Sequence, residues 1–305
     1  MAHAAIEATG LTKRYGALTV VDDVSFTVRP GAVTGFLGPN GAGKTTTLRM
    51  VLGLARPTAG SATIGGHALA DADDPARLVG ANLEVCGAHP GRSGRQHLRA
   101  LAAMARLPDS RVEEVLRLVE LGDAADRRAG QYSLGMRQRL GLAATLLGDP
   151  EVLVLDEPAN GLDPQGIRWL RDVLRASAAE GRTVLVSSHV LAEVAQTVDD
   201  VLVIHHGRLI EQGPVDALTG ARGVAVASPR LDLLRPALER EGAVVRFDGP
   251  ERLRVEGLTA PRIGDLAHAA GAPLHELAEQ TASLEEVFFA LTSDAPVLTA
   301  PEQPA

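Results

Sequence analysis

The chain has 305 residues, 45% of them hydrophobic, which is enough for one large domain, or a large and a small one, each with its own core. The formal net charge of −8 argues against a nucleic-acid-binding surface, which needs a basic face. Cys86 is the only cysteine, which excludes an intrachain disulfide and a thiolate metal cluster. No secretory signal is visible and no apolar run reaches the roughly 18 residues of a membrane span, so we expect a soluble, cytoplasmic protein.

The predicted elements change character along the first 215 residues. Residues 4–30 alternate apolar and polar side chains, which predicts half-buried antiparallel strands. From Val33 onward, continuous apolar strands alternate with helices, which indicates a parallel sheet covered on both faces. Residues from about 84 to 130 show helical stretches only and predict an inserted helical subdomain. The predicted strands are Val33–Leu37, Glu151–Leu155, Thr183–Ser187 and Val201–His205, and the predicted helices are Lys44–Leu54, Gln96–Arg106, Ser110–Leu121, Arg137–Leu147, Gly166–Glu180 and Val190–Val198.

A domain boundary is predicted between Gly213 and Arg222. The following residues, 222–293, indicate a small α+β unit in which Asp248 and Gly249 form a hairpin turn. The tail 294–305, rich in Pro, Ala and Glu, is expected to be disordered. The predicted strands of this unit are Val224–Ala227, Ala243–Phe247 and Arg252–Val255, and its helices are Leu231–Arg240, Arg262–Ala270 and Leu284–Leu291.

The most informative segment, Gly38–Thr46, lies between the first buried strand and the first helix. It matches the pattern G-x-x-x-x-G-K-[ST], whose backbone N–H groups surround nucleotide phosphates. Glycines let the backbone approach an anion closely, and the following helix directs its positive end to the same place. Lys44 is expected at the β- and γ-phosphates and the Thr45 hydroxyl at Mg²⁺. The nucleotide-binding residues are Gly38, Pro39, Asn40, Gly41, Ala42, Gly43, Lys44, Thr45 and Thr46.

Two acids, Asp156 and Glu157, follow the apolar strand that begins at Val152. The carboxyl end of a parallel strand is where a doubly wound sheet binds its ligand. Asp156 is therefore expected to hold Mg²⁺ and Glu157 to polarise the attacking water. Alone, the two acids would be interpreted as solvated residues that end a strand, but the phosphate loop belongs to the same predicted sheet.

A second anion-binding helix terminus is predicted at Ser133 and Gly135, where a serine and a glycine open a helix that continues with basic residues. One nucleotide does not need two such termini from one subunit. A second subunit could bring this terminus onto the γ-phosphate. The alternative is that Ser133 only caps its helix.

In the order of these motifs, residues from about 5 to 215 resemble the ATP-binding subunit of ABC transporters. Tyr15 matches the aromatic residue on which adenine stacks in that family. The narrower sequence Tyr-Ser-Leu-Gly-Met-Arg-Gln-Arg and the segment Leu284–Phe288 resemble exporters of the antibiotic- and multidrug-resistance type (ABC-2, daunorubicin resistance). The other matching segments are Gly38–Thr46 (phosphate loop), Ser133–Arg137 (signature), Leu155–Pro158 (Walker B), Asn160–Asp163 (D-loop) and Ser187–His189 (switch histidine).

The resemblance implies a P-loop nucleoside triphosphatase fold: an antiparallel β subdomain, a parallel-sheet core and a helical subdomain, here with a small C-terminal α+β unit. It also implies a homodimer, or a dimer with a similar ATPase, that encloses two ATP molecules with Mg²⁺. Ser133 and Gly135 would then bind the nucleotide of the partner subunit, and Asp163 would link the two sites. His189 would contact the γ-phosphate beside Glu157. A separate transmembrane permease would hold the subunit at the inner face of the cell membrane, and no nucleic acid is expected.

Two positions depart from the family pattern. The signature is usually Ser-Gly-Gly-Gln, whereas here Leu134 and Met136 replace the second and fourth residues. The family usually has glutamine where this chain has Glu84, at the loop into the helical subdomain. We expect Glu84 to bind Mg²⁺ more directly and to make the metal more strictly required, since a carboxylate adds a third acid to the site. The alternative is an exposed acid without a metal contact.

Three other functions stay open at this point. The first is an importer ATPase of the same superfamily. The second is a soluble ABC ATPase of translation or DNA repair, although this class usually has two cassettes, a zinc module or a long coiled coil. The third is a binding module without turnover, against which the intact Lys44, Asp156, Glu157 and His189 argue. The sequence does not predict which substrate is transported.

Overall fold

A computed structural model describes residues 5–83, 87–190, 196–281 and 283–293. This part of the chain divides into two compact units, of which the second is Val215–Ala290. The division falls in the stretch from 213 to 222 where the sequence changes character. Within the described ranges, every helix is too short or too polar to cross a bilayer. The two units are described in turn.

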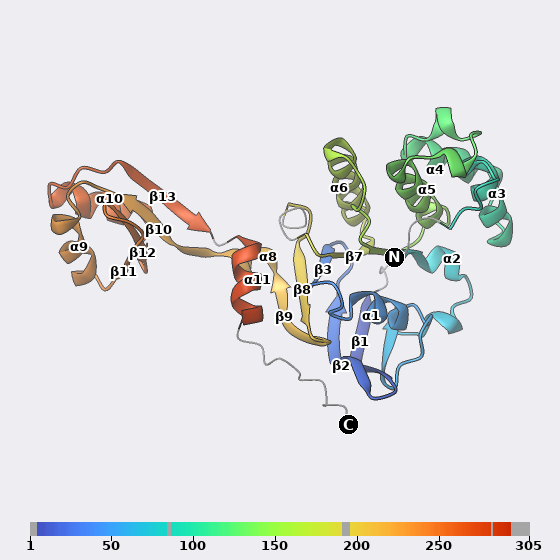
Figure 1. The fold of residues 1–305 in the computed structure, drawn as a ribbon, viewed down its shortest axis with the longest axis horizontal. Coiled ribbons are helices and arrows are strands. Elements are labelled where there is room, and N and C mark those ends of the chain that lie inside the picture. The colour runs from blue at the N-terminus through green and yellow to red at the C-terminus, as the bar shows by residue number, and fades with distance from the viewer. Residues whose placement is uncertain (1–4, 84–86, 191–195, 282, 294–305) are drawn as a thin grey trace, which may run out of the picture. The chain divides into compact units, whose positions relative to one another are not determined.

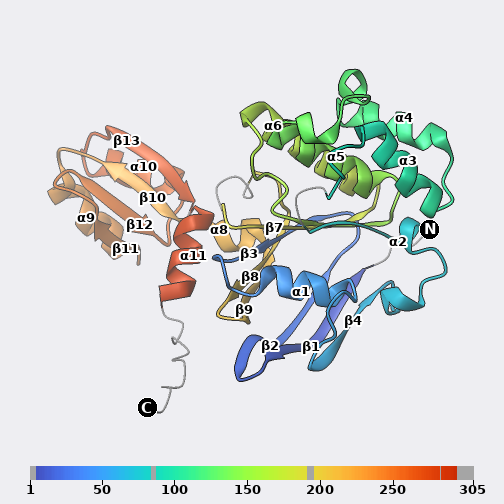
Figure 2. The ribbon, with the colours of Figure 1, turned by 45° about the vertical axis from the view of Figure 1, so that its right-hand side comes forward.

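The first unit contains a three-stranded antiparallel sheet with the order β2-β1-β4. Alternate residues of its strands are buried, as the period of two in the sequence predicted. Figure 2 shows helix α1 between this sheet and the larger sheet of the same unit. Leu48 and Val51 of α1 belong to the core that both sheets share. The elements are β1 (Ile6–Tyr15), β2 (Leu18–Val28), β4 (Ala59–Ile64) and α1 (Lys44–Val51).

The larger sheet has six strands in the order β5-β6-β7-β3-β8-β9. Its first five strands are parallel, and β9 pairs antiparallel with β8. All residues of β3 and β7 are buried, which explains their continuous apolar sequences. The strands are β3 (Val33–Leu37), β5 (Val79–Asn82), β6 (Val152–Asp156), β7 (Thr183–Ser188), β8 (Asp200–His205) and β9 (Arg208–Pro214).

The predicted parallel-sheet fold is confirmed, but three strands of this unit were not predicted. β4 is built from small residues and its first half is exposed, so it lacks an apolar pattern. β5 has only four residues and includes Gly80. β9 has no fully buried residue, because it is the antiparallel edge strand of the sheet.

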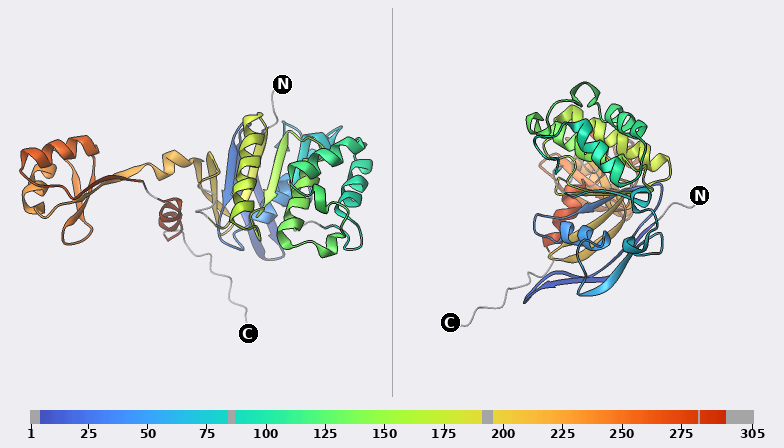
Figure 3. Two further views of the ribbon diagram at one scale, coloured as in Figure 1. Left: turned by 90° about the horizontal axis from the view of Figure 1, so that it is seen from above. Right: turned by 90° about the vertical axis from the view of Figure 1, so that its right-hand side faces the viewer.

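Three helices between β5 and β6 form the helical subdomain, visible in Figure 3 as the teal-to-green group. The Ser93 side chain accepts from the Gln96 N–H and the Gln96 side chain accepts from the Ser93 N–H, a capping box that starts the first helix. The predicted helix 190–198 falls largely outside the described residues. Besides α1, the described helices of the first unit are α2 (Pro75–Leu78), α3 (Gly94–Met104), α4 (Asp109–Leu118), α5 (Leu134–Leu146) and α6 (Pro164–Ala179), with 3₁₀ turns at Leu69–Asp71, Gly122–Ala124 and Ala129–Gln131.

The second unit has the order β-α-β-β-α-β and a four-stranded antiparallel sheet, β11-β12-β10-β13, which is the split βαβ arrangement. Helices α9 and α10 pack on one face of this sheet around Leu234, Leu253 and Ile263 (Figure 1). Strand β13 was not predicted, because it alternates polar residues with few apolar ones. The elements are α8 (Val215–Thr219), β10 (Ala221–Ala227), α9 (Leu231–Arg240), β11 (Val244–Phe247), β12 (Arg252–Glu256), α10 (Ala260–Ala269), β13 (Glu276–Thr281) and α11 (Leu284–Ser293).

Candidate active site

Three neighbouring parallel strands, β6, β7 and β3, end at one edge of the large sheet. Asp156 at the end of β6 is in register with Ser187 of β7, and Leu37 at the end of β3 is in register with Ser188. The segments that leave these strands therefore begin side by side. This is the edge at which open α/β sheets bind their ligands.

The loop 38–46 connects β3 to α1 and lines a cavity of about 200 Å³. Gly43 adopts φ +104° as the N-cap of α1, and a Cβ there would lie 2.8 Å from the Val20 carbonyl oxygen. A Cβ on Gly38 would lie 2.4 Å from the Ile204 carbonyl oxygen. Both positions therefore require glycine. The loop residues that line the cavity are Pro39, Asn40, Gly41, Gly43, Lys44, Thr45 and Thr46.

Lys44 extends across this loop and is only 6% exposed. Its ammonium donates to the Gly38 carbonyl at 2.7 Å and to the Pro39 carbonyl at 3.3 Å. The same nitrogen lies 3.5 Å from a carboxylate oxygen of Glu157. A buried cation is thus held at the mouth of the loop by neutral and charged oxygens, where an anionic group would find a positive charge.

Asp156 joins the first turn of α1 to the ends of β6 and β7. The Thr45 hydroxyl donates to its Oδ2 at 2.6 Å, and the Ser187 hydroxyl donates to its Oδ1. Asp156 and Thr45, which were both predicted from the sequence to be Mg²⁺ ligands, are therefore in direct contact. Both supply oxygen atoms, which are the ligands that Mg²⁺ prefers.

Glu157 follows Asp156 with a left-handed backbone, φ +51°. Its N–H donates to Ser187 Oγ at 3.0 Å, which holds this uncommon conformation. One carboxylate oxygen lies 2.7 Å from His189 Nδ1, and the other faces Lys44. The structure thus brings together four predicted residues from three strand ends: Lys44, Asp156, Glu157 and His189.

Tyr15 lies at the end of β1 and is 55% exposed. The ammonium of Lys13 lies 5.0 Å from its ring centre, a cation–π contact. The ring is therefore accessible for stacking with a planar ligand.

Ser133 and Gly135 lie at the start of α5, beside Gly161 of the D-loop. Ser133 is the N-cap of α5, where its hydroxyl accepts from the Met136 N–H at 3.2 Å. Leu134 packs on the D-loop, since a Cβ on Gly161 would lie 2.2 Å from its side chain. Asp163 caps α6 by accepting from the Gly166 N–H at 2.8 Å. In the described chain, no hydrogen bond or ion pair joins this group to residues 38–46.

Glu84, the predicted third acid of the site, lies outside the described residues. Ser187 was interpreted only as part of the segment that ends at His189, although its hydroxyl contacts the Asp156 carboxylate and the Glu157 N–H. A signal for it would have been a hydroxyl at the end of the strand next to β6, but the strand order is needed to use that signal.

Comparison with known proteins identifies the family. An ABC transporter domain model matches residues 21–160, and a domain of unknown function matches residues 222–285. The chain is 36% identical over 317 residues to a daunorubicin resistance ATP-binding protein of Streptomyces coeruleorubidus, which covers 96% of this chain and 98% of that protein. The chain belongs to the ATP-binding subunits of ABC transporters. It is an ATPase of the type found in ABC-2 exporters.

Further relatives of this ABC ATPase agree with that assignment. It is 43% identical over 216 residues to the bacitracin transport ATP-binding protein of Bacillus licheniformis, covering 70% of this chain and 71% of that protein. It is 38% identical over 308 residues to a Nod factor export ATP-binding protein of Ralstonia nicotianae, covering 93% and 92%. A solved ATP-binding subunit of an ABC transporter matches with a TM-score of 0.64 and 30% identity over 70% of this chain and 91% of that one.

We predict that Ser187→Ala lowers the turnover number for ATP roughly tenfold or more, because it leaves the partly buried N–H of Glu157 without its acceptor, at a cost of about 1–3 kcal/mol. ATP affinity should change little, because Lys44 and the loop amides are untouched. Steady-state kinetics and nucleotide titration separate the two effects. Ser188→Ala is the matched control, since among the described residues the Ser188 hydroxyl bonds to the backbone of Val190 and not to Asp156 or Glu157. Equal turnover in both variants would contradict the role of Ser187.

Proposed function

We propose that this ATPase dimerises around two ATP molecules and drives export of a small molecule through a separate membrane permease. The observation that supports this most is the presence of two helix termini suited to anions. α1 begins at Lys44 beside Glu157, and α5 begins at Ser133 beside the D-loop, with no hydrogen bond or ion pair between the two groups among the described residues. Each terminus would be half of a nucleotide site, and a second copy would supply the other half.

The phosphates would be bound by the loop amides of Gly38–Thr46 and by Lys44, with the positive end of α1 behind them. Tyr15 would stack on adenine. Thr45 and Asp156 fit Mg²⁺, because their oxygens already lie 2.6 Å apart at the loop. In the described residues, no group of three or more His, Cys, Asp or Glu could hold a metal alone, so phosphate oxygens and water would complete the ligand shell. The metal would neutralise charge that develops on the phosphates.

Hydrolysis would begin at Glu157. Its carboxylate accepts the proton of the attacking water, and His189, 2.7 Å away, orients this carboxylate and contacts the γ-phosphate. Lys44 lies on the other side of Glu157 and stabilises the charge of the transferred group. Ser133 and Gly135 of the second subunit would donate N–H groups to the same phosphate. Asp163, next to the signature helix, would link the two sites.

The transported compound is proposed from the relatives. Proteins named for bacitracin transport, daunorubicin resistance and Nod factor export all match this chain, so a drug-like, antibiotic-like or lipid-like compound is proposed as the substrate. These names favour export over import and over a non-transport ABC ATPase. The subunit would work at the cytoplasmic face of the membrane, bound to its permease, as a homodimer or with a similar ATPase.

We predict that Glu157→Gln forms stable dimers with ATP and Mg²⁺, since the shared site can close but the water is not activated. Size-exclusion chromatography with light scattering should show the mass double with ATP and return to one subunit with ADP. Adding Lys44→Ala to the same chain should abolish the dimer. A monomer at saturating ATP, or normal turnover, would contradict the proposal.

A second prediction concerns Glu84. If it is a metal ligand, Glu84→Gln should shift the Mg²⁺ midpoint of ATPase activity about tenfold upward, as for losses around other metal sites. The preference of the enzyme for Mg-ATP over metal-free ATP should also shrink, because the variant lacks the Glu84 carboxylate that repels the phosphates of metal-free ATP. Glu151→Gln, at the opposite end of β6, is the control. An unchanged midpoint would reject the metal contact.

A further inference from the structure

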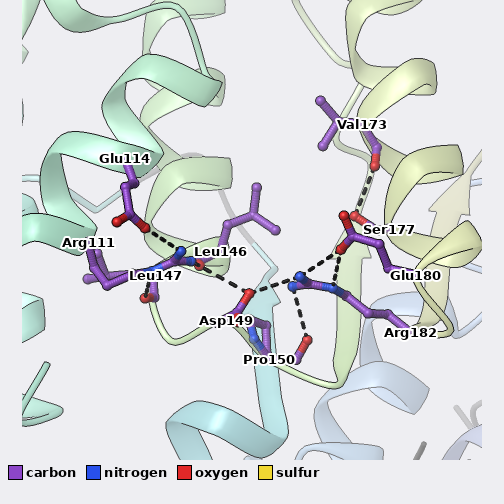
Figure 4. Close-up of polar contacts among 10 residues, drawn as sticks. All are labelled: Arg111, Glu114, Leu146, Leu147, Asp149, Pro150, Val173, Ser177, Glu180 and Arg182. Atoms are coloured by element: carbon purple, nitrogen blue, oxygen red, sulfur yellow. Dashed lines mark hydrogen bonds and ion pairs between the residues drawn. The ribbon is translucent and has the colours of Figure 1, made fainter.

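The five residues 147–151 connect the end of α5 to the start of β6. This turn is short and joins two functional elements, because α5 begins at Ser133 and β6 ends at Asp156. Arg111 of α4 and Arg182, directly before β7, supply side-chain contacts to it (Figure 4). Its geometry therefore contributes to the direction of the signature helix relative to the strand that ends at the two acids.

Arg111 of α4 caps the C-terminal end of α5. Its guanidinium donates to the Leu146 carbonyl at 2.9 Å and to the Leu147 carbonyl at 3.3 Å (Figure 4). These carbonyls have no partner within the helix, and a cation is favourable at this negative helix end. The Arg111 guanidinium is also held by Glu114 at 2.7 Å. Helix α4 is thus attached to the end of α5 and not only to its side.

Arg182 approaches the same turn from the sheet, directly before β7. It donates to Asp149 at 2.8 Å, to Glu180 at 2.9 Å and to the Pro150 carbonyl at 3.3 Å. The Arg182 side chain is 18% exposed. Strand β7 begins at the next residue, Thr183, and ends at Ser188 next to His189, so this arginine directly precedes the strand that leads to the catalytic group.

Asp149 lies between the two arginines. The same carboxylate oxygen is 2.8 Å from Arg182 and 3.7 Å from Arg111 (Figure 4). Asp149 has φ +54°, which few residues other than Gly, Asn and Asp adopt readily. Without its charge, two partly buried guanidinium groups would face each other across the turn with only their outer acids left, Glu114 and Glu180.

The length of α5 amplifies any movement at this turn. Thirteen residues at about 1.5 Å each make a helix about 20 Å long, so a tilt of about 5° at its C-terminal end displaces Ser133 by roughly 1.7 Å. A misplacement of about 1 Å at a reacting centre can reduce a rate about a hundredfold. A small change of helix direction at residue 149 therefore becomes a large displacement of Ser133.

We propose that Asp149 is a positioning residue, which fixes the direction of the signature helix by joining Arg111 of the helical subdomain to Arg182 of the sheet. This inference rests on the proposed function, because Ser133 must act on the nucleotide of a second subunit. Asp149 makes no contact with Lys44, Asp156 or Glu157 within the described contacts. Its loss should weaken closure of the dimer without weakening binding of ATP to one subunit.

The test uses the full chain with Glu157→Gln as parent. Asp149→Asn is added because asparagine keeps the size and tolerates the left-handed backbone. We expect the dissociation constant of the ATP-bound dimer to rise about tenfold or more, while ATP affinity of the monomer changes less than about twofold. Analytical ultracentrifugation measures the first quantity and fluorescent-nucleotide titration the second. Asp172→Asn, an exposed acid of α6 beside Arg171, is the matched control and should leave both unchanged.

The outcomes are distinct. If Asp149→Asn dimerises as tightly as its parent, or loses ATP binding and dimerisation together, the positioning role is overturned. If the parent itself stays monomeric, the proposed function fails and this inference fails with it. Arg111→Gln gives an independent check, because it should also raise the dissociation constant of the dimer. The double variant should have a dissociation constant no higher than that of the single variant with the larger effect, because both residues act through the same turn.

Discussion

The contact on which the other features depend is the one between Asp156 and two hydroxyls. Thr45 bonds one of its oxygens at 2.6 Å and Ser187 bonds the other, so the first turn of α1 and the ends of β6 and β7 are joined at one carboxylate. The phosphate loop, Glu157 and His189 follow directly after β3, β6 and β7. Their positions are set by strand register, which a buried parallel sheet specifies strongly.

The proposed shared site rests on a second helix terminus of the same subunit. Lys44 of the phosphate loop is buried and lies 3.5 Å from Glu157, whereas the terminus at Ser133 lies beside the D-loop. In the proposed dimer, a second copy brings that terminus to the nucleotide. The proposed role of Asp149 follows from this, because the turn that contains Asp149 connects the signature helix to β6.

Much of this arrangement could be predicted from the sequence, for identifiable reasons. Lys44 and Asp156 were found because a glycine-rich loop and an apolar strand with terminal acids have local signatures. His189 was assigned by family resemblance alone. Ser187 was missed because its role depends on β7 lying next to β6, which is a tertiary fact. Strands β5 and β9 were missed because a four-residue strand with a glycine and a half-exposed edge strand have no apolar pattern. The Arg111–Asp149–Arg182 contacts were missed because these residues come from three elements.

The most direct test of the shared site mixes two variants, each inactive by itself. Lys44→Ala removes the phosphate-loop cation, and Gly135→Asp places a negative charge at the signature while remaining compatible with a helix N-terminus. In a mixed dimer, one site has both defects and the other has none. The account predicts that an equal mixture regains about a quarter of the native ATPase activity, since about half the dimers are mixed and each has one intact site. Activity no greater than the sum of the separate variants would contradict it.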